Sequence, residues 1–80
     1  MIMLNSIEHI GIAVRNIESS RQIFDLLFDD SAYKLEEVAS EHVRTLFYRT
    51  GPNKIELLEA TNPEGAIAKF IDRKGEGIHH

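Results

Sequence analysis

Apolar and polar residues alternate over four short segments of the chain, a pattern typical of β-strands with two different faces. Residues 7–14 are rich in β-branched side chains and are expected to form a buried strand. Residues 33–38 predict a second strand, exposed because it carries two adjacent glutamates. Residues 43–49 and 54–59 alternate more clearly and flank Gly51-Pro52-Asn53, so two further strands joined by a turn are expected.

The alternation also predicts which residues share a face. In the first strand, Ile7, His9, Gly11 and Ala13 fall together. In the third strand one face is expected to carry Val43, Thr45, Phe47 and Arg49, and the other face Arg44, Leu46 and Tyr48. In the fourth, Ile55, Leu57 and Glu59 are expected to oppose Glu56 and Leu58.

Two segments follow the helical period instead. Asn16 is a suitable N-cap for a helix whose apolar stripe is predicted to comprise Ile17, Ile23, Phe24, Leu27 and Phe28, and residues 29–31 have turn chemistry that ends it.

The second helix is expected to start at Thr61 or Asn62, with Pro63 at its first position and Glu64 in its first turn. Its apolar residues are Ile67, Phe70 and Ile71, and Gly75 or Gly77 suits its end. Residues 77–80 are expected to begin another strand.

Composition narrows the class of protein. Eighty residues are near the lower limit for one self-sufficient core, and the absence of cysteine excludes disulfides and a thiolate zinc site. A net charge of −4 gives little support to a nucleic-acid-binding surface and none to an anionic membrane surface. The N-terminus has no basic run before its apolar residues, which argues against a signal peptide, and no apolar run is long enough to span a membrane. A cytoplasmic location is the default expectation.

The strand histidines are the first candidates for chemistry. His9 is followed by Gly and small residues that leave space beside its ring, and Glu56 lies on another expected strand. Together they offer one nitrogen and one oxygen ligand to a divalent metal. Residues 78–80 echo residues 7–10, which suggests His80 as a third ligand. From the residues alone, a hydrogen-bonded structural histidine and a solvent-facing glutamate are the more common explanation of this pattern.

Three motifs resemble methylmalonyl-CoA epimerases of the vicinal-oxygen-chelate superfamily, which also contains glyoxalases, bleomycin resistance proteins and dioxygenases. Residues 7–14 (IEHIGIAV) are similar to the family's opening strand, and residues 54–59 (KIELLE) to its fourth strand. Residues 69–80 resemble its helix end and its Gly-rich step into a second module. The His-His pair after Lys74-Gly75-Glu76-Gly77 indicates the epimerase branch.

The resemblance implies an α+β fold built from βαβββ modules whose sheets curl around a metal site. Residues 1–60 would form one module, and residues 61–80 a connecting helix and the start of a second module. It also implies the family reaction on an acyl-CoA substrate. This reaction inverts the configuration of the carbon between the thioester and the carboxylate of methylmalonyl-CoA.

The resemblance further implies metal ligands at His9, at Glu56, where some relatives carry Gln, and at His80. The metal would be cobalt, manganese, nickel, zinc or magnesium. The family's fourth ligand, a Glu late in the second module, has no counterpart here. His79 is expected to face away from the metal, because adjacent strand residues point to opposite faces.

The family places a catalytic Glu in a Pro-Glu-x-Gly-Val context just before the third strand. Ser40-Glu41-His42-Val43 is similar, which makes Glu41 the candidate base, with a solvated loop Glu as the alternative. The Gly before Val43 is absent, which puts the direction of the Glu41 side chain in doubt.

Other polar and aromatic residues have simpler explanations. His42 is expected to be an exposed loop residue. Arg15, Arg44 and Arg49 could contact a CoA phosphate, although solvated surface positions are the simpler interpretation. The phenylalanines 24, 28, 47 and 70 are expected in the core.

Three interpretations of an 80-residue chain with half of the family's parts remain open. In the first, the chain is a part of an epimerase and folds at best in part. In the second, it is one module that forms a homodimer, so that two copies of His9 and Glu56 share a site. In the third, it is a non-catalytic module that binds a small ligand or metal. A one-module glyoxalase-like lyase is a further alternative. The expected partner is an acyl-CoA, not nucleic acid or a membrane.

Overall fold

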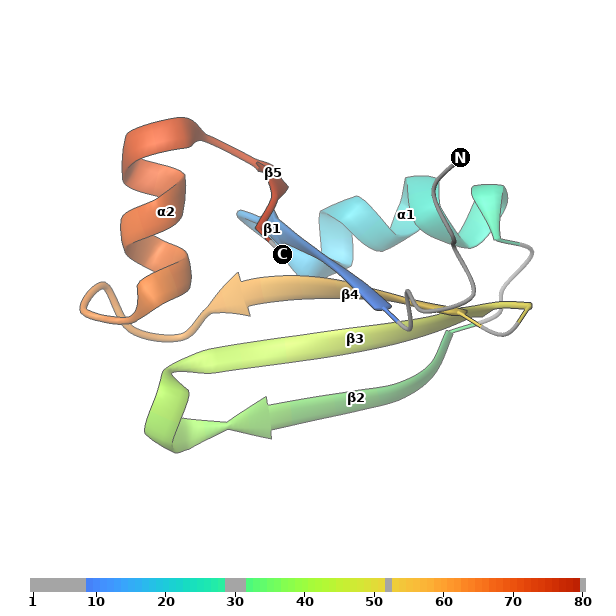
Figure 1. Ribbon diagram of the computed structural model, residues 1–80, viewed down its shortest axis with the longest axis horizontal. Coiled ribbons are helices and arrows are strands. Elements are labelled where there is room, and N and C mark those ends of the chain that lie inside the picture. The colour runs from blue at the N-terminus through green and yellow to red at the C-terminus, as the bar shows by residue number, and fades with distance from the viewer. Residues whose placement is uncertain (1–8, 29–31, 52, 80) are drawn as a thin grey trace, which may run out of the picture.

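The computed structural model describes residues 9–28, 32–51 and 53–79 and confirms a βαβββ module followed by a helix and a short strand (Figure 1). The elements are, in chain order, β1 (His9–Val14), α1 (Ile17–Leu27), β2 (Ala32–Val38), the 3₁₀ turn η2 (Ala39–Glu41), β3 (Val43–Thr50), β4 (Asn53–Ala60), α2 (Ala66–Lys74) and β5 (Gly77–Ile78). Within these ranges no helix has the length and hydropathy needed to cross a membrane.

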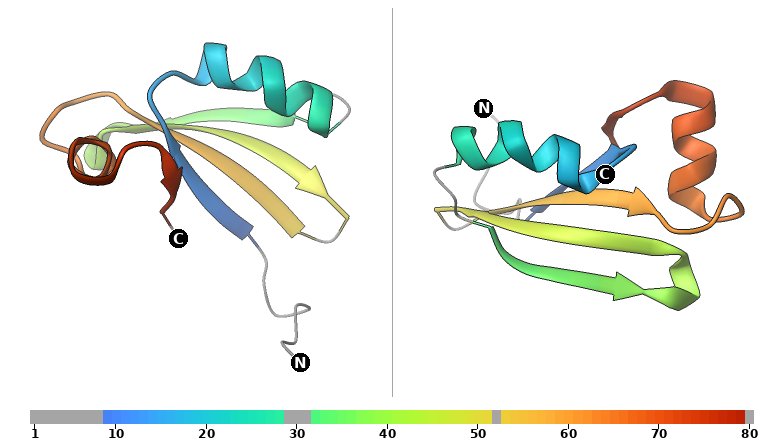
Figure 2. Two further views of the ribbon diagram at one scale, coloured as in Figure 1. Left: turned by 90° about the horizontal axis from the view of Figure 1, so that it is seen from above. Right: turned by 180° about the vertical axis from the view of Figure 1, so that it is seen from behind.

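All the strands belong to one sheet, in the order β2-β3-β4-β1-β5. β1 is parallel to β4, and the other neighbours are antiparallel. Helix α1 covers one face of the sheet, whereas α2 stands at the end where β4 finishes (Figures 1 and 2). In the described part of the chain, therefore, no helix covers much of the face opposite α1.

The core under α1 is built around Tyr48, Ile17 and Leu57, which are fully buried. Phe24 and Phe28 of the helix pack on the Tyr48 ring at centroid distances of 6.1 and 5.6 Å. The predicted N-cap is confirmed, since the Asn16 side chain accepts a hydrogen bond from the Ser19 amide at 2.8 Å.

The predicted stripe of α1 is wrong at two positions. Ile23 and Leu27 are 62% and 68% exposed, although Ile17, Phe24 and Phe28 face the sheet. At about 100° per residue, Ile23 lies about 120° around the helix from Ile17, whereas Phe24 and Phe28 lie almost in line with it. The residues proposed to end this helix, 29–31, lie outside the described ranges.

A polar network joins α1 to β3. The Tyr48 hydroxyl donates to Asp25 Oδ1 at 2.7 Å, and Arg21 Nε donates to Asp25 Oδ2 at 3.1 Å. The hydrogen bond from Tyr48, followed by that from Arg21, lowers the pKa of Asp25, against an opposing effect of desolvation. A carboxyl with a lowered native pKa stabilises the fold above its unfolded pKa, and this contribution is lost as pH falls through the native pKa.

We therefore expect Tyr48→Phe to raise the pKa of Asp25 towards its ordinary value and to move acid unfolding to higher pH. Carboxyl chemical shifts followed by NMR and unfolding followed by circular dichroism measure the two effects. Tyr33→Phe, which removes a hydroxyl from an exposed ring on β2, is the control. An unchanged pKa of Asp25 in Tyr48→Phe would contradict this role of the hydrogen bond.

Helix α2 starts later than predicted. Its N-cap is Gly65, and its buried contact is Ile67, which packs with Ala13, Val43 and Leu58. Residues 61–64 form a turn instead, in which the Asn62 side chain accepts from the Glu64 amide and the Asn62 carbonyl from the Gly65 amide. The predicted end at Gly75 is confirmed, with φ +77° and an amide that donates to the Ile71 carbonyl.

Candidate functional site

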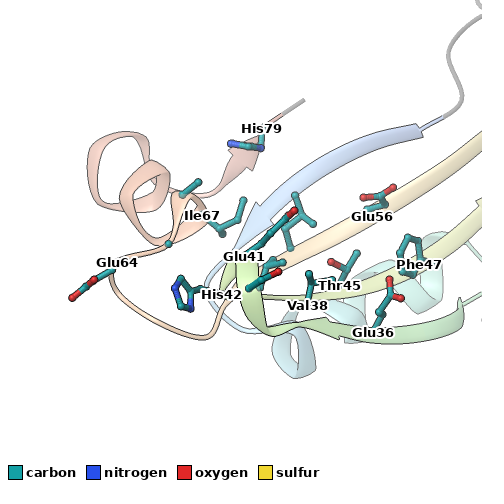
Figure 3. A pocket seen from close by; sticks show the side chains of 15 residues that line it. Glu36, Val38, Glu41, His42, Thr45, Phe47, Glu56, Glu64, Ile67 and His79 are labelled. Atoms are coloured by element: carbon teal, nitrogen blue, oxygen red, sulfur yellow. The ribbon is translucent and has the colours of Figure 1, made fainter.

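A cleft of about 640 Å³ lies on the sheet face opposite α1, between the strands and the start of α2 (Figure 3). Its lining includes four carboxylates and two histidines, which are Glu36, Glu41, Glu56, Glu64, His42 and His79. Figure 3 shows Glu56 and Phe47 towards one end of the cleft, and His42 and Glu64 towards the other. The cleft therefore combines apolar side chains, such as Val43 and Leu58, with carboxylates and histidines, as ligand sites commonly do.

Strand register sets the order of side chains across the floor. Lys34, Phe47, Glu56 and Gly11 are successive partners across β2, β3, β4 and β1. Phe47 is half-buried in this cleft, so its expected place in the core is wrong, although its predicted face is right. Alternation had placed it beside Val43 and Thr45, and both line the same cleft.

Of the three predicted metal ligands, the structure describes one completely. Glu56 is half-buried on the cleft floor. For His9 only the backbone is described; it pairs with Lys54, two positions before the Gly11–Glu56 pair. His80 lies outside the described residues, among which no group of three potential ligands is close enough to hold a metal ion. A carboxylate with two imidazoles suits a divalent cation chemically, and the ligand set stays a prediction.

His79, which was expected to face away from the metal, lines the same cleft as Glu56. Its amide donates to the Gly11 carbonyl at 2.7 Å, and the pairing of Ile78 with Ile12 and of Gly77 with Ala13 aligns residue 79 with Gly11. Alternation then turns His79 to the face of Glu56, where it lines the cleft and meets Phe70 edge-on at 5.1 Å. The described residues do not define a metal position, so the direction of His79 relative to a metal stays a prediction.

Glu41, the candidate base, is the last residue of η2, is exposed and lines the cleft. The residue after it, His42, is partly buried rather than an exposed loop residue, and it adopts the left-handed conformation with φ 58° and ψ 46°. His42 therefore occupies, directly before Val43, the conformation that glycine favours. The absence of the family's Gly does not remove the turn, but puts a Cβ into it.

Because this conformation strains a side chain, we expect His42→Gly to raise the free energy of unfolding by about 0.5–1 kcal/mol. Urea denaturation measures the change. His42→Ala keeps the Cβ in the same conformation and is the matched control, expected to give no such gain. Equal stability of the Gly and Ala variants would show that the turn is unstrained.

The η2 turn is held against the start of α2. The Thr61 amide donates to the His42 carbonyl at 2.9 Å, and Gly65 is buried beside the same turn. A Cβ on Gly65 would lie 2.8 Å from the His42 Cβ and 3.3 Å from the Glu41 carbonyl oxygen. This role of Gly65 was not predicted from the sequence; the signal was a glycine directly before the apolar positions of a helix.

Two further carboxylates, which were also not predicted from the sequence, hold backbone segments next to the sheet in place. Glu59 Oε1 accepts from the Ile17 amide at 2.9 Å, at the start of α1. Glu76, from the Gly-rich motif, accepts from the Arg15 amide at 2.7 Å and so ties the segment before β5 to the end of β1. That segment carries His79 into the cleft.

Residues 8–80 match the Glyoxalase/Bleomycin resistance protein/Dioxygenase superfamily. The chain belongs to this superfamily. Among curated proteins it is 31% identical over 77 residues to the uncharacterized protein YqjC of Bacillus subtilis (strain 168), covering 96% of this chain and 55% of that one. The predicted superfamily is thereby confirmed.

Solved structures of the superfamily superimpose closely on the chain. Hypothetical protein BH1468 from Bacillus halodurans C-125 is 40% identical, with a TM-score of 0.89 over 94% of this chain and 54% of that one. A Streptomyces coelicolor methylmalonyl-CoA epimerase variant in complex with 2-nitronate-propionyl-CoA is 26% identical, with a TM-score of 0.84 over 92% of this chain and 57% of that one. The chain thus spans about half the length of the relatives it matches.

Proposed function

We propose that the chain provides one half of a metal-dependent epimerase site that acts on methylmalonyl-CoA, by removal of the proton alpha to the thioester. The observation that carries the proposal is that Glu41 and Glu56 line one cleft in a module similar to that of methylmalonyl-CoA epimerases. One carboxylate, Glu41, sits at the end of the η2 turn, and the other, Glu56, sits on strand β4.

The two carboxylates are proposed to have different roles. Glu56 is half-buried between paired strands, which suits a fixed ligand. Glu41 is exposed at the end of a turn, which suits a group that must reach a substrate carbon and exchange its proton. A base on one face of the substrate accounts for half of an epimerisation, since inversion requires a second donor on the opposite face.

We propose His9, Glu56 and His80 as the ligands of a divalent cation, by the resemblance to the epimerases. The chemistry that such a cation supplies is Lewis-acid stabilisation of the negative charge that develops on the thioester oxygen. The remaining ligands would come from a second module or from a second copy of the chain, whose solution mass distinguishes a monomer from a homodimer.

The proposal is tested by following conversion of one epimer of methylmalonyl-CoA into the other, with metal-stripped chain and after cobalt is restored. Cobalt binding is measured on the same sample by calorimetry. We expect Glu56→Ala to lose both binding and conversion, and Glu56→Gln to retain part of each, because an amide oxygen can still ligate. Glu37→Gln, an exposed strand position, is the control. A folded, metal-loaded homodimer, in which a second copy can supply the opposite donor, that converts no substrate would count against the proposal.

A further inference from the structure

The structure separates the three arginines that the sequence left as candidates for phosphate contact. The Arg44 guanidinium lies 3.9 Å from Glu59 Oε1, on the side of the sheet where Glu59 binds the start of α1. Arg15 precedes α1 in the turn after β1. Arg49 lies two positions after Phe47 on β3, so its side chain is on the same face as Phe47 and the cleft.

An irregularity in β2 gathers aromatic side chains around Arg49. The register shifts between Ala32 and Lys34, so that Ala32 pairs with Tyr48 and Lys34 with Phe47. The bulge brings Tyr33 and Lys34 to the same side: the Tyr33 ring lies 6.0 Å from the Phe47 ring, and the Lys34 ammonium lies 5.5 Å over it. Bulges often redirect side chains next to functional sites.

The same region concentrates positive charge. The Arg49 guanidinium lies 4.7 Å over the Tyr33 ring, and Arg49 is directly opposite Lys54 in the β3–β4 register. Like charges at such paired positions destabilise a sheet. Among the described residues no carboxylate forms a salt bridge with Arg49 or Lys54, whereas Lys34 is 3.6 Å from Glu36. An anion between Arg49 and Lys54 would relieve their repulsion.

We propose that this platform (Tyr33, Lys34, Phe47, Arg49 and Lys54) binds the phosphorylated adenosine end of a CoA thioester. The inference rests on the proposed function, because it assigns the other end of the same substrate. Arg49 and Lys54 offer charge-assisted hydrogen bonds to phosphate oxygens. The exposed Tyr33 ring and the stacked guanidinium offer a flat surface to the adenine.

The platform is continuous with the cleft. Phe47 belongs to both, and it pairs with Glu56 in the register. From Val43, beside η2, to Arg49 the strand extends about 20 Å at about 3.4 Å per residue. An extended thioester arm can therefore run along β3, with its acyl group near Glu41 and its phosphates at the platform.

The test is calorimetric titration of the chain with CoA, with 3′,5′-adenosine diphosphate and with pantetheine. CoA and the nucleotide are expected to bind, more weakly at higher salt, and pantetheine to bind at least about tenfold more weakly than CoA. The double variant Arg49→Gln/Lys54→Gln should weaken CoA binding at least about tenfold. Arg44→Gln, on the opposite face, should leave the affinity for CoA unchanged. Melting of the ligand-free double variant should show no loss of stability, because a repulsion is removed.

Several results would overturn the platform. These are equal affinity for CoA and pantetheine, unchanged CoA affinity in the double variant, or inorganic phosphate that binds as tightly as the nucleotide. The two proposals fail separately. Normal CoA binding without epimerisation would reject only the function, and equal turnover of methylmalonyl-pantetheine and methylmalonyl-CoA would reject only the platform.

Discussion

Replacing Glu41 with glutamine is expected to slow epimerisation of methylmalonyl-CoA by roughly 100- to 10,000-fold, the usual contribution of a general base. The amide keeps the size and polarity of the side chain but cannot take up the substrate proton. Glu41 is exposed, so the fold and the binding of CoA should not change. The loss should appear in kcat rather than in KM.

Glu37→Gln provides the matched control, since it also removes one exposed carboxylate near η2, from the strand before it. Initial rates of epimer conversion and calorimetric CoA affinity should be compared for both variants. If Glu41→Gln converts substrate as fast as Glu37→Gln, Glu41 is a solvated loop residue and the base lies elsewhere.

Replacing Gly65 with alanine is expected to lower the free energy of unfolding by about 1–3 kcal/mol, the usual cost of overpacking a buried site. The new Cβ would lie 2.8 Å from the Cβ of His42 and 3.3 Å from the Glu41 carbonyl oxygen, a backbone atom of η2. A shift of η2 also displaces Glu41, so we expect epimerisation to fall with stability.

The contact can be isolated by a double-mutant cycle. His42→Gly removes the Cβ that the new methyl group meets, so Gly65→Ala should cost much less in that background. Gly77→Ala, where an added Cβ has no neighbour within 4 Å, is the control for replacing a glycine without a new steric contact. Urea denaturation gives the four free energies of the cycle. Additive effects of the two substitutions would mean that the contact with the His42 Cβ is not the cause of the stability lost in Gly65→Ala.

The sequence predicted the fold where one physical signal dominated. Alternation placed Phe47 and Tyr48 on opposite faces correctly, and Asn16 had the side chain and position of an N-cap. The apolar stripe of α1 was predicted incorrectly because Ile23 and Leu27 are as apolar as the residues that pack. Only the position of the sheet decides which side of the helix is buried.

The site was less predictable because it depends on contacts between distant segments. The direction of His79 is set by pairing of β5 with β1, and the place of Glu41 by the approach of Gly65 to His42. The bulge at Tyr33 interrupts alternation, which no local pattern indicated. The metal-ligand set and the role of Glu41 came from the resemblance and remain predictions.

The most direct test of the proposed site is incorporation of deuterium at the alpha carbon of methylmalonyl-CoA in D₂O. The chain is used with cobalt bound, and exchange is followed by mass spectrometry. We expect exchange well above the rate in buffer, lost after chelation and in Glu41→Gln but kept in Glu37→Gln. Exchange no faster than in buffer, with folded and metal-loaded chain, would contradict the account.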